Sequence, residues 1–457
     1  MNKIELLKLR RAKLLDSGKE IRDKISEIID ENSFVELDGY SFSKNDFYDE
    51  EIAGEGVVTG YATIGGNPVY VIAQNISEKY GGVSLANCKK IRKCQEKALE
   101  SGFPVIYLLE SLGVQVGEGV NVLEGIADVM RASSELKATA VQISVVLGKV
   151  YGSTALLAAN SDFCFALKGA EICYASPLVI AASQKCADAG KVAGAANFEN
   201  NGICSGEIET LGEAREKIIS VLDMAQGCGI VDTDDDLNRA SENLNEKCCP
   251  KCIVDAVFDD GKFFETNPAF SPEVKTGLGR IGGINVAAII FGGGEKGVEL
   301  DVKNVVKIKE FANFAAENSL PLVTFVNTLP LKEDVATNAT PVLKEVCGLI
   351  DALNGCMRLS VIYGKAVGLG YALFAAKSSG IEYSYAFANA KVALFDGKAS
   401  SIAFGEVRED KLDKFEEIYS EENADPINAA KNGYIDNVIE PAFVRSYVIS
   451  ALQMMVR

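Results

Sequence analysis

Two junctions between a strand-like run and a small-residue helix are the positions of this sequence best suited to chemistry. One contains Gly152 and Ser153, and the other contains Gly368, Leu369 and Gly370. The first backbone N–H groups of a helix have no partner inside the helix, and small residues there let a carbonyl oxygen approach these donors. Both junctions are therefore candidate oxyanion holes, although each glycine could equally serve only to make a tight turn.

The side-chain chemistry is restricted because the 457 residues include no histidine. Histidine-dependent nucleophiles, zinc sites and general bases are excluded for that reason. Cys249 and Cys252 form a C-x-x-C pair, but a zinc ribbon needs a second such pair, which the sequence lacks. We therefore expect loop thiols and no metal site, with catalysis by backbone dipoles, carboxylates, lysines, thiols or an external cofactor.

Composition and charge indicate a globular protein that does not bind nucleic acid. Hydrophobic residues make up 48% of the chain, and 46 basic against 64 acidic residues give a net charge of −18, which repels polyanions. The charged segment 1–10 lacks the apolar core of a signal peptide, and no apolar run is long enough to span a membrane. Several of the twelve cysteines lie in apolar runs, namely Cys164, Cys173 and Cys347. These features predict a cytoplasmic protein with reduced, mostly buried thiols.

The elements that must position the two junctions follow an alternating pattern. Leucine and isoleucine at helical spacing predict an amphipathic helical leader over residues 1–30. Short strand-like runs then alternate with helices, which indicates α/β architecture. Residues 277–282 match G-x-G-x-x-G, but the strand-like residues 285–291 follow them, so we expect a β-hairpin and no dinucleotide site.

An internal repeat explains why the junction occurs twice. Ile64-Gly65-Gly66 recurs as Ile281-Gly282-Gly283, an offset of 217, and residues 104–106 recur at 321–323 with the same offset. The strand and turn at 144–152 recur at 360–368, offset by 216. The sequence therefore predicts a tandem duplication. The expected parts are the leader at 1–30, a first domain at 31–231, an acidic linker at 232–251 and a second domain at 252–457.

An ordered series of short motifs resembles the carboxyltransferase subunit of biotin-dependent acyl-CoA carboxylases and of the related acyl-CoA decarboxylases. The motifs lie at residues 56–61, 81–85, 90–91, 117–120, 143–147, 257–261 and 277–283. The similarity covers nearly the whole chain. The resemblance implies two ClpP/crotonase-like ββα-superhelix domains in tandem. It also implies that a carboxyl group moves between biotin and the α-carbon of an acyl-CoA, through an enolate held by backbone oxyanion holes.

The resemblance assigns roles residue by residue. The backbone donors that it implies are Gly152 and Ser153 on the thioester side and Gly368, Leu369 and Gly370 on the biotin side. The cofactor-binding residues that it implies are Gly113, Gly117, Lys90, Gly292 and Gly293.

The resemblance also implies partners. The first domain of one subunit would hold the acyl-CoA and the second domain of a neighbour would receive biotin, so a homo-oligomer is expected, usually a hexamer built as a dimer of trimers. Biotin would arrive on a separate biotin carboxyl carrier protein, because this chain has no biotinylation motif. The remaining partner would be a biotin carboxylase subunit or a membrane decarboxylase subunit.

Departures from the family pattern leave alternatives open. Ser153 and Leu369 replace the second glycine usual at each turn, and residues 110–115 lack a glycine and an arginine. Residues 292–294 replace an N-Q-P stretch, and Ala372 replaces an acidic residue. One alternative is a biotin-independent crotonase-type hydrolase or isomerase that uses Glu110 or Glu118. Another is a catalytically reduced assembly subunit. The acyl group and the direction of reaction stay open.

Overall fold

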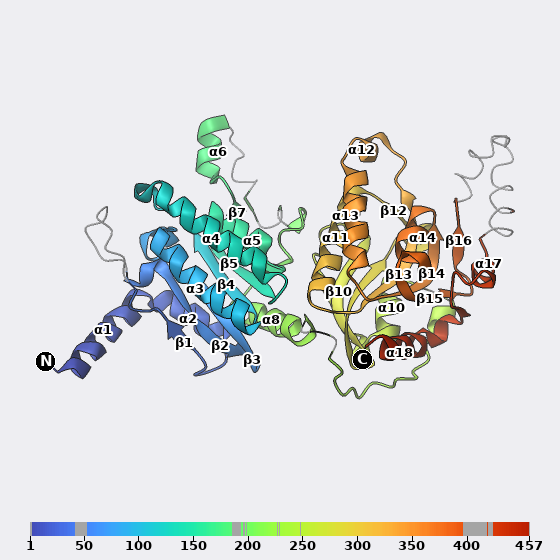
Figure 1. The fold of residues 1–457 in the computed structure, drawn as a ribbon, viewed down its shortest axis with the longest axis horizontal. Helices are drawn as coiled ribbons and strands as arrows, with labels where there is room; N and C mark the ends of the chain where they lie inside the picture. The colour runs from blue at the N-terminus through green and yellow to red at the C-terminus, as the bar shows by residue number, and fades with distance from the viewer. Residues whose placement is uncertain are drawn as a thin grey trace. The chain divides into compact units, whose positions relative to one another are not determined.

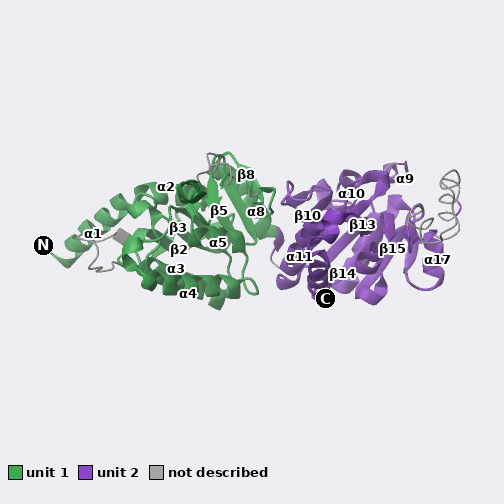
Figure 2. Ribbon diagram, turned by 90° about the horizontal axis from the view of Figure 1, so that it is seen from above, with its two compact units in different colours: residues 1–223 green, residues 224–457 purple. Residues whose placement is uncertain are grey.

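The computed structural model describes residues 2–41, 53–184, 193–194, 197, 199–225, 227, 229–246, 248–395, 418 and 424–456. The chain divides into two compact units, residues 1–223 and 224–457, each of which contains helices packed on a twisted sheet (Figures 1 and 2). The units are described one at a time.

The first unit begins with two helices, α1 (Lys3–Ser17) and α2 (Lys19–Ile28). Its strands are β1 (Val35–Leu37), β2 (Val57–Ile64), β3 (Asn67–Gln74), β4 (Val105–Ser111), β5 (Gln142–Tyr151), β6 (Phe163–Leu167), β7 (Glu171–Cys173) and β8 (Gly206–Ile208). The other helices are α3 (Leu85–Ser101), α4 (Val120–Leu136), α5 (Ser153–Asn160), α6 (Pro177–Gln184) and α8 (Leu211–Ala225). The sheet has the order β1-β2-β3-β4-β5-β6-β8, and β7 pairs with the end of β5.

The second unit has the same plan. Its strands are β9 (Phe263–Thr266), β10 (Val274–Ile281), β11 (Ile284–Phe291), β12 (Val298–Leu300), β13 (Leu322–Leu331), β14 (Arg358–Val367), β15 (Ile381–Phe387), β16 (Lys391–Ala393) and β17 (Asn437–Ile439). Its helices are α9 (Asn243–Glu246), α10 (Pro250–Val257), α11 (Val302–Glu317), α12 (Val335–Asn338), α13 (Val342–Asn354), α14 (Leu369–Phe374), α17 (Pro426–Lys431) and α18 (Val444–Met455).

Strand order confirms the predicted duplication. The second sheet runs β9-β10-β11-β13-β14-β15-β17, and β16 pairs with β14 as β7 pairs with β5. In both sheets the first three strands pair antiparallel and the later ones pair parallel. Strand β12, which pairs with β13, has no counterpart in the described part of the first sheet. Strands β10 and β11 pair along their whole length, so the G-x-G-x-x-G stretch forms the expected hairpin.

An aspartate clamps the glycine turn of this hairpin in each unit. Asp259 accepts the N–H groups of Gly282 and Gly283 at 2.8 and 2.7 Å, and Arg445 of α18 donates to Asp259 at 2.7 Å. The first unit repeats this arrangement with Asp30, the turn at 65–66 and Arg215 of α8. The clamp connects the hairpin to the last helix of each unit.

Parts of the predicted leader and linker pack within the two units. In α2, Ile21, Ile25 and Ile28 are buried and the helix packs on β2 and β3, so it belongs to the first unit. The acidic segment 232–251 contains α9 and the start of α10. Its Asp235 forms ion pairs with Arg239 and with the buried Arg445, which needs anionic partners inside the second unit.

The cysteines match the expectation in part. Five described free thiols are buried, and Cys164 and Cys173 are among them, whereas Cys347 is exposed. Cys249 and Cys252 form a disulfide, which corrects the expectation of loop thiols there, because the helix turn that starts α10 brings the two sulfurs together. Within the described ranges, no helix has the length and apolar character needed to cross a membrane.

Candidate active sites

The first candidate site is built on Gly152, which links β5 to α5. Its φ of +70° and ψ of −138° form a backbone conformation that glycine adopts without the steric cost of a Cβ. Its N–H donates to the carbonyls of Cys173 and Tyr174 at 3.2 and 3.0 Å. The segment at the end of β7 thus occupies this N–H, and the expectation that it is an oxyanion donor stays a prediction. The N–H groups of Ser153 and Thr154 stand at the start of the helix, where α5 itself cannot satisfy them.

Gly113 lies beside this turn, as expected for a residue of the same site. A Cβ on Gly152 would lie 3.8 Å from the Cα of Gly113, in the loop that follows β4. The carbonyl of Gly113 accepts the N–H of Val83 at 2.9 Å, which fixes the loop against the segment before α3. Two loops from adjacent parallel strands thus converge at the N-terminus of α5.

An apolar pocket opens next to the same helix terminus. Ser153, Thr154 and Leu157 of α5 line it together with side chains on and near α3 and α4, namely Val83, Cys88, Ile91, Ile126, Val129 and Met130. Its remaining polar residue is Gln74, which is 1% exposed. Gln74 donates to the hydroxyl of Thr154 at 3.1 Å and accepts the N–H of Glu110 at 3.2 Å. Gln74 was missed from sequence, although a polar residue that ends an apolar strand is a signal of such a role.

The second candidate site repeats the turn. Gly368 has a φ of +54° and a ψ of −124° before α14, and its N–H donates to the carbonyl of Ala393 in β16 at 3.0 Å. The Gly368 N–H is thus occupied as the Gly152 N–H is, and its donor role stays a prediction. Leu369 is half-buried, and Gly370 is buried so tightly that a Cβ would come within 2.5 Å of Thr328 Cγ2. The end of β13 therefore covers the start of α14.

Asn327 organises the loop of residues 292–294, which we call the Gly292 loop. Its amide nitrogen donates to the carbonyls of Gly292 and Gly294, each at 2.7 Å, and its oxygen accepts the N–H of Lys365 at 2.9 Å. Asn327 is 2% exposed and stands at a bulge between β13 and β14. The corresponding bulge between β4 and β5 carries Glu110.

The other four predicted cofactor-binding residues are placed differently from Gly113. Lys90 is buried and donates to the carbonyls of Gly54 and Val57 at 3.0 and 2.6 Å, so its ammonium group has structural partners, and its role in holding a ligand stays a prediction. Gly117 lies on an exposed turn before α4, and Gly293 is exposed at the tip of the Gly292 loop. Gly292 itself is buried beneath that tip, and its N–H donates to the carbonyl of Glu273 at 2.7 Å.

The two carboxylates considered as acid–base groups have structural partners. Glu118 is 8% exposed and accepts the N–H of Leu85 at 2.7 Å, which anchors the start of α3. Glu110 pairs with Lys24 of α2 at 3.3 Å. No group of three metal-ligating side chains occurs in the part of the chain that the structure describes.

Comparison with known proteins gives one family over almost the whole chain. The carboxyl transferase domain family matches residues 15–457. The methylmalonyl-CoA decarboxylase subunit alpha of Veillonella parvula is 28% identical, and the alignment covers 99% of this chain and 96% of that protein. The carboxyltransferase subunit of propionyl-CoA carboxylase from Haloferax mediterranei is 26% identical, with 96% and 91% covered.

Solved structures agree on the fold. The transcarboxylase 12S hexamer crystallised with methylmalonyl-coenzyme A superposes with a TM-score of 0.92 at 22% identity, covering 99% of this chain and 95% of that chain. A single-chain, multi-domain long-chain acyl-CoA carboxylase superposes with a TM-score of 0.83 at 18% identity and covers 98% of this chain. The tandem crotonase-type fold expected from the sequence is confirmed.

Proposed function

Because this chain belongs to the carboxyl transferase domain family, we propose that it is an enzyme that moves a carboxyl group between biotin and the α-carbon of an acyl-CoA. The observation that carries the proposal is the pair of equivalent glycine turns at Gly152 and Gly368, each at the start of a helix. Transfer of a carboxyl group to or from a thioester develops negative charge on oxygen, and backbone N–H groups at helix starts stabilise such charge.

The first unit has the features that a thioester requires. Apolar side chains of α3, α4 and α5 border the start of α5, and the N–H groups of Ser153 and Thr154 lie beside them, so the proposed acyl site has an apolar border next to polar donors. The absence of a side chain at Gly113 and Gly152 leaves space for the thioester carbonyl between the two loops. The Gln74 hydrogen bond holds Thr154 in place and fixes the direction of these donors.

The second unit offers the matching site for biotin. When bound, biotin supplies the carboxyl group and, after losing it, a basic ureido group, so that no histidine is needed. Residues at the start of α14, Leu369 and Gly370, are the proposed donors toward the biotin carbonyl. The Gly292 loop, held by Asn327, is the proposed wall of that site.

The carriers and partners are also part of the proposal. Biotin would be delivered on a separate carrier protein, as the chain contains no biotinylation motif. The likeness to subunits of a decarboxylase and of a carboxylase supports a second partner, either a membrane decarboxylase subunit or a biotin carboxylase subunit. The buried free thiols support a reducing, cytoplasmic location.

Self-association completes the proposal. The structural relative with a TM-score of 0.92 is a hexamer, and the first unit exposes apolar side chains that an interface could bury, among them Val116, Val120 and Leu178. We expect light scattering to show a hexamer that is active, and dilution to monomers to abolish turnover. An active monomer would contradict the proposed assembly.

Biotin dependence tests the function itself. The purified chain is incubated with methylmalonyl-CoA or malonyl-CoA, with and without free biotin, and loss of the carboxyl group is followed by mass spectrometry. We expect decarboxylation that requires biotin. Thioester hydrolysis without biotin would instead indicate a crotonase-type hydrolase, although Glu110 and Glu118 are already engaged. Inactivity with every thioester, together with tight binding of a carrier protein, would indicate an assembly subunit.

A further inference from the structure

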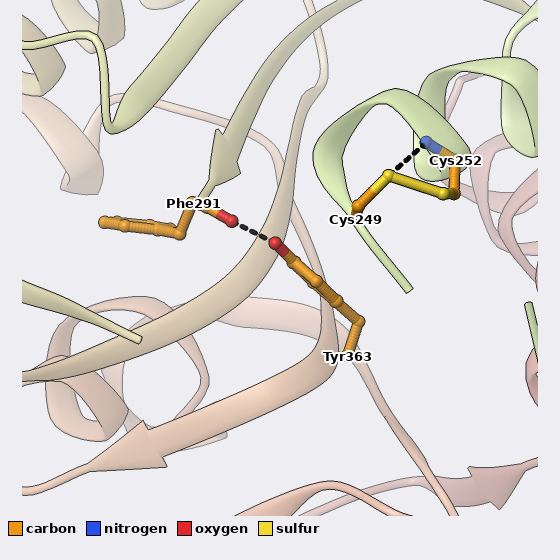
Figure 3. The surroundings of a disulfide bond; sticks show 4 residues. All are labelled: Cys249, Cys252, Phe291 and Tyr363. Carbon is orange, nitrogen blue, oxygen red and sulfur yellow. Dashed lines mark hydrogen bonds between the residues drawn. A yellow bond between two sulfur atoms is a disulfide. The ribbon is translucent and has the colours of Figure 1, made fainter. Parts of the chain in front are cut away.

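A disulfide stands at the start of α10 in the second unit. Cys249 is the N-cap of this helix and Cys252 lies in its first turn, and their sulfurs are bonded (Figure 3). The backbone N–H of Cys252 points at the sulfur of Cys249, 3.2 Å away. Both cysteines are half-buried.

The chemical setting favours a pair that can open and close. A cysteine at a helix N-terminus is stabilised as a thiolate by the helix dipole and by the free N–H groups, which makes it a good nucleophile and a good leaving group. Pro250 occupies the first helical position, where its missing N–H costs no intrahelical hydrogen bond. The third thiol, Cys248, has its pKa raised to about 12 by burial, so it stays protonated and does not compete.

The disulfide lies beside the Gly292 loop. A Cβ added to Gly292 would lie 3.7 Å from Pro250 Cγ, so Pro250, which lies between the two cysteines in the sequence, is a near neighbour of this loop. The preceding residue, Phe291, accepts a hydrogen bond through its carbonyl from the hydroxyl of Tyr363 on β14 (Figure 3). Asn327 and Tyr363 thus hold the Gly292 loop through hydrogen bonds, and Pro250 of the disulfide turn lies next to Gly292.

We propose that Cys249 and Cys252 form a reversible thiol–disulfide site that controls how firmly Pro250 packs on the Gly292 loop. The reductant is a low-molecular-weight thiol such as glutathione. Its thiolate attacks the sulfur of Cys252, a mixed disulfide forms, and Cys249 leaves as a thiolate that then takes up a proton. A second glutathione thiolate resolves the mixed disulfide, releasing glutathione disulfide and the Cys252 thiol, so two electrons pass to the protein.

Reduction removes the covalent constraint on the first turn of α10, so Pro250 and the Gly292 loop become more mobile. The consequence for biotin binding rests on the proposed function, but the loosening of the loop does not. Redox state is therefore expected to change the KM for biotin and to leave acyl-CoA binding unchanged.

Thiol trapping and hydrogen exchange test the inference on the full chain. The protein is equilibrated in glutathione buffers of varying redox ratio, free thiols are alkylated, and modified peptides are identified by mass spectrometry. We expect Cys249 and Cys252 to titrate together and reversibly. Hydrogen exchange at residues 291–297 should be faster in the reduced form, on the order of tenfold.

Matched variants distinguish the effect of the Cys249–Cys252 disulfide from any effect of the neighbouring Cys248. The double variant Cys249→Ser/Cys252→Ser should exchange like the reduced protein in every buffer, whereas Cys248→Ser should behave like the wild type. A pair that does not titrate, or that titrates without any change at residues 291–297, would overturn the inference. The cysteine pair could instead titrate, and residues 291–297 could loosen, as expected while neither the oxidised nor the reduced protein shows biotin-dependent turnover. That result would count against the proposed function and not against the redox site.

Discussion

Lys90 in α3 and Lys307 in α11 make the same buried interaction in the two units. Each lysine is 3% exposed, and its ammonium group donates to carbonyls at or just before the start of the first long strand of its sheet. Lys90 donates to Val57 at 2.6 Å, and Lys307 donates to Phe270 at 2.7 Å. The offset of 217 between the two lysines equals that of the repeat, so the duplication extends to a specific polar contact in the core.

The first prediction concerns the pH dependence of stability. Burial lowers the pKa of both Lys90 and Lys307 to about 8 from a reference value of 10.5. Between these values the unfolded chain binds more protons than the folded chain, so the free energy of unfolding rises with pH. Lys90→Met removes one of the two groups. Denaturant unfolding should therefore show the stability of the wild type, relative to this variant, increasing from about pH 8 to pH 10.

An adjacent lysine provides the control for this experiment. Lys89 is exposed on the same helix, and Lys89→Met should change stability by less than about 0.5 kcal/mol at every pH. If the free energies of unfolding of the wild type and Lys90→Met differed by a constant amount across this pH range, folding would not lower the pKa of Lys90.

The second prediction compares the two hairpin clamps. Burial opposes the ionisation of Asp259, but the N–H groups of Gly283 and Gly282 and the Arg445 guanidinium outweigh it and lower its pKa. The side chains of Arg445 and Asp259 are 1% and 9% exposed, whereas those of Arg215 and Asp30 are 29% and 26% exposed. Asp259→Asn should therefore cost about 3–5 kcal/mol, and Asp30→Asn about 1 kcal/mol.

Chemical unfolding followed by circular dichroism measures both costs. Asp30→Asn in the first unit is the matched control, because it removes a carboxylate charge from the equivalent glycine turn, where the ion pair is more exposed to solvent. Equal losses of stability in the two variants would show that burial of Arg445 does not strengthen its clamp.

The sequence predicted the repeat and the two turns because glycines and apolar runs recur at a fixed spacing. It could not show that the N–H of Gly152 is already used, because the acceptors lie 21 and 22 residues later, at the end of β7. Such pairing depends on the closed sheet and leaves no local pattern.

The aspartate clamps were missed for a related reason. Asp30 and Asp259 lie 229 residues apart in the sequence, whereas the glycine turns that they bind lie 217 residues apart. The aspartates therefore break the spacing of the repeat, because segments of different length join them to the two hairpins. The charged residues Lys90 and Asp235 were assigned to a ligand site and to a linker, because a sequence gives charge but not burial. Only packing shows that both side chains satisfy groups inside their own unit.

The third prediction tests the first turn. Gly152→Ala adds a Cβ at a φ of +70° beside Gly113, which should displace the N–H groups of Ser153 and Thr154. Loss of one oxyanion donor costs about 10²–10³ in rate, so biotin-dependent turnover should fall by that factor. The control is Gly169→Ala, which also has a positive φ but is exposed with nothing within 4 Å of the new Cβ. A similar loss of turnover in both variants would point to general strain.

The last prediction tests Asn327 as a positioning residue for the Gly292 loop. Asn327→Asp keeps the shape of the side chain but replaces two N–H donors with an acceptor, which leaves the carbonyls of Gly292 and Gly294 facing a carboxylate. A buried group that loses its hydrogen bond costs about 1–3 kcal/mol, so the KM for biotin should rise about tenfold. Acyl-CoA binding, measured by calorimetry, should not change, because Asn327 belongs to the other unit. The matched variant Glu110→Gln changes the equivalent bulge of the first unit and should leave the KM for biotin unaltered. If Asn327→Asp weakened acyl-CoA binding and spared biotin, the assignment of the Gly292 loop to the biotin side would be wrong.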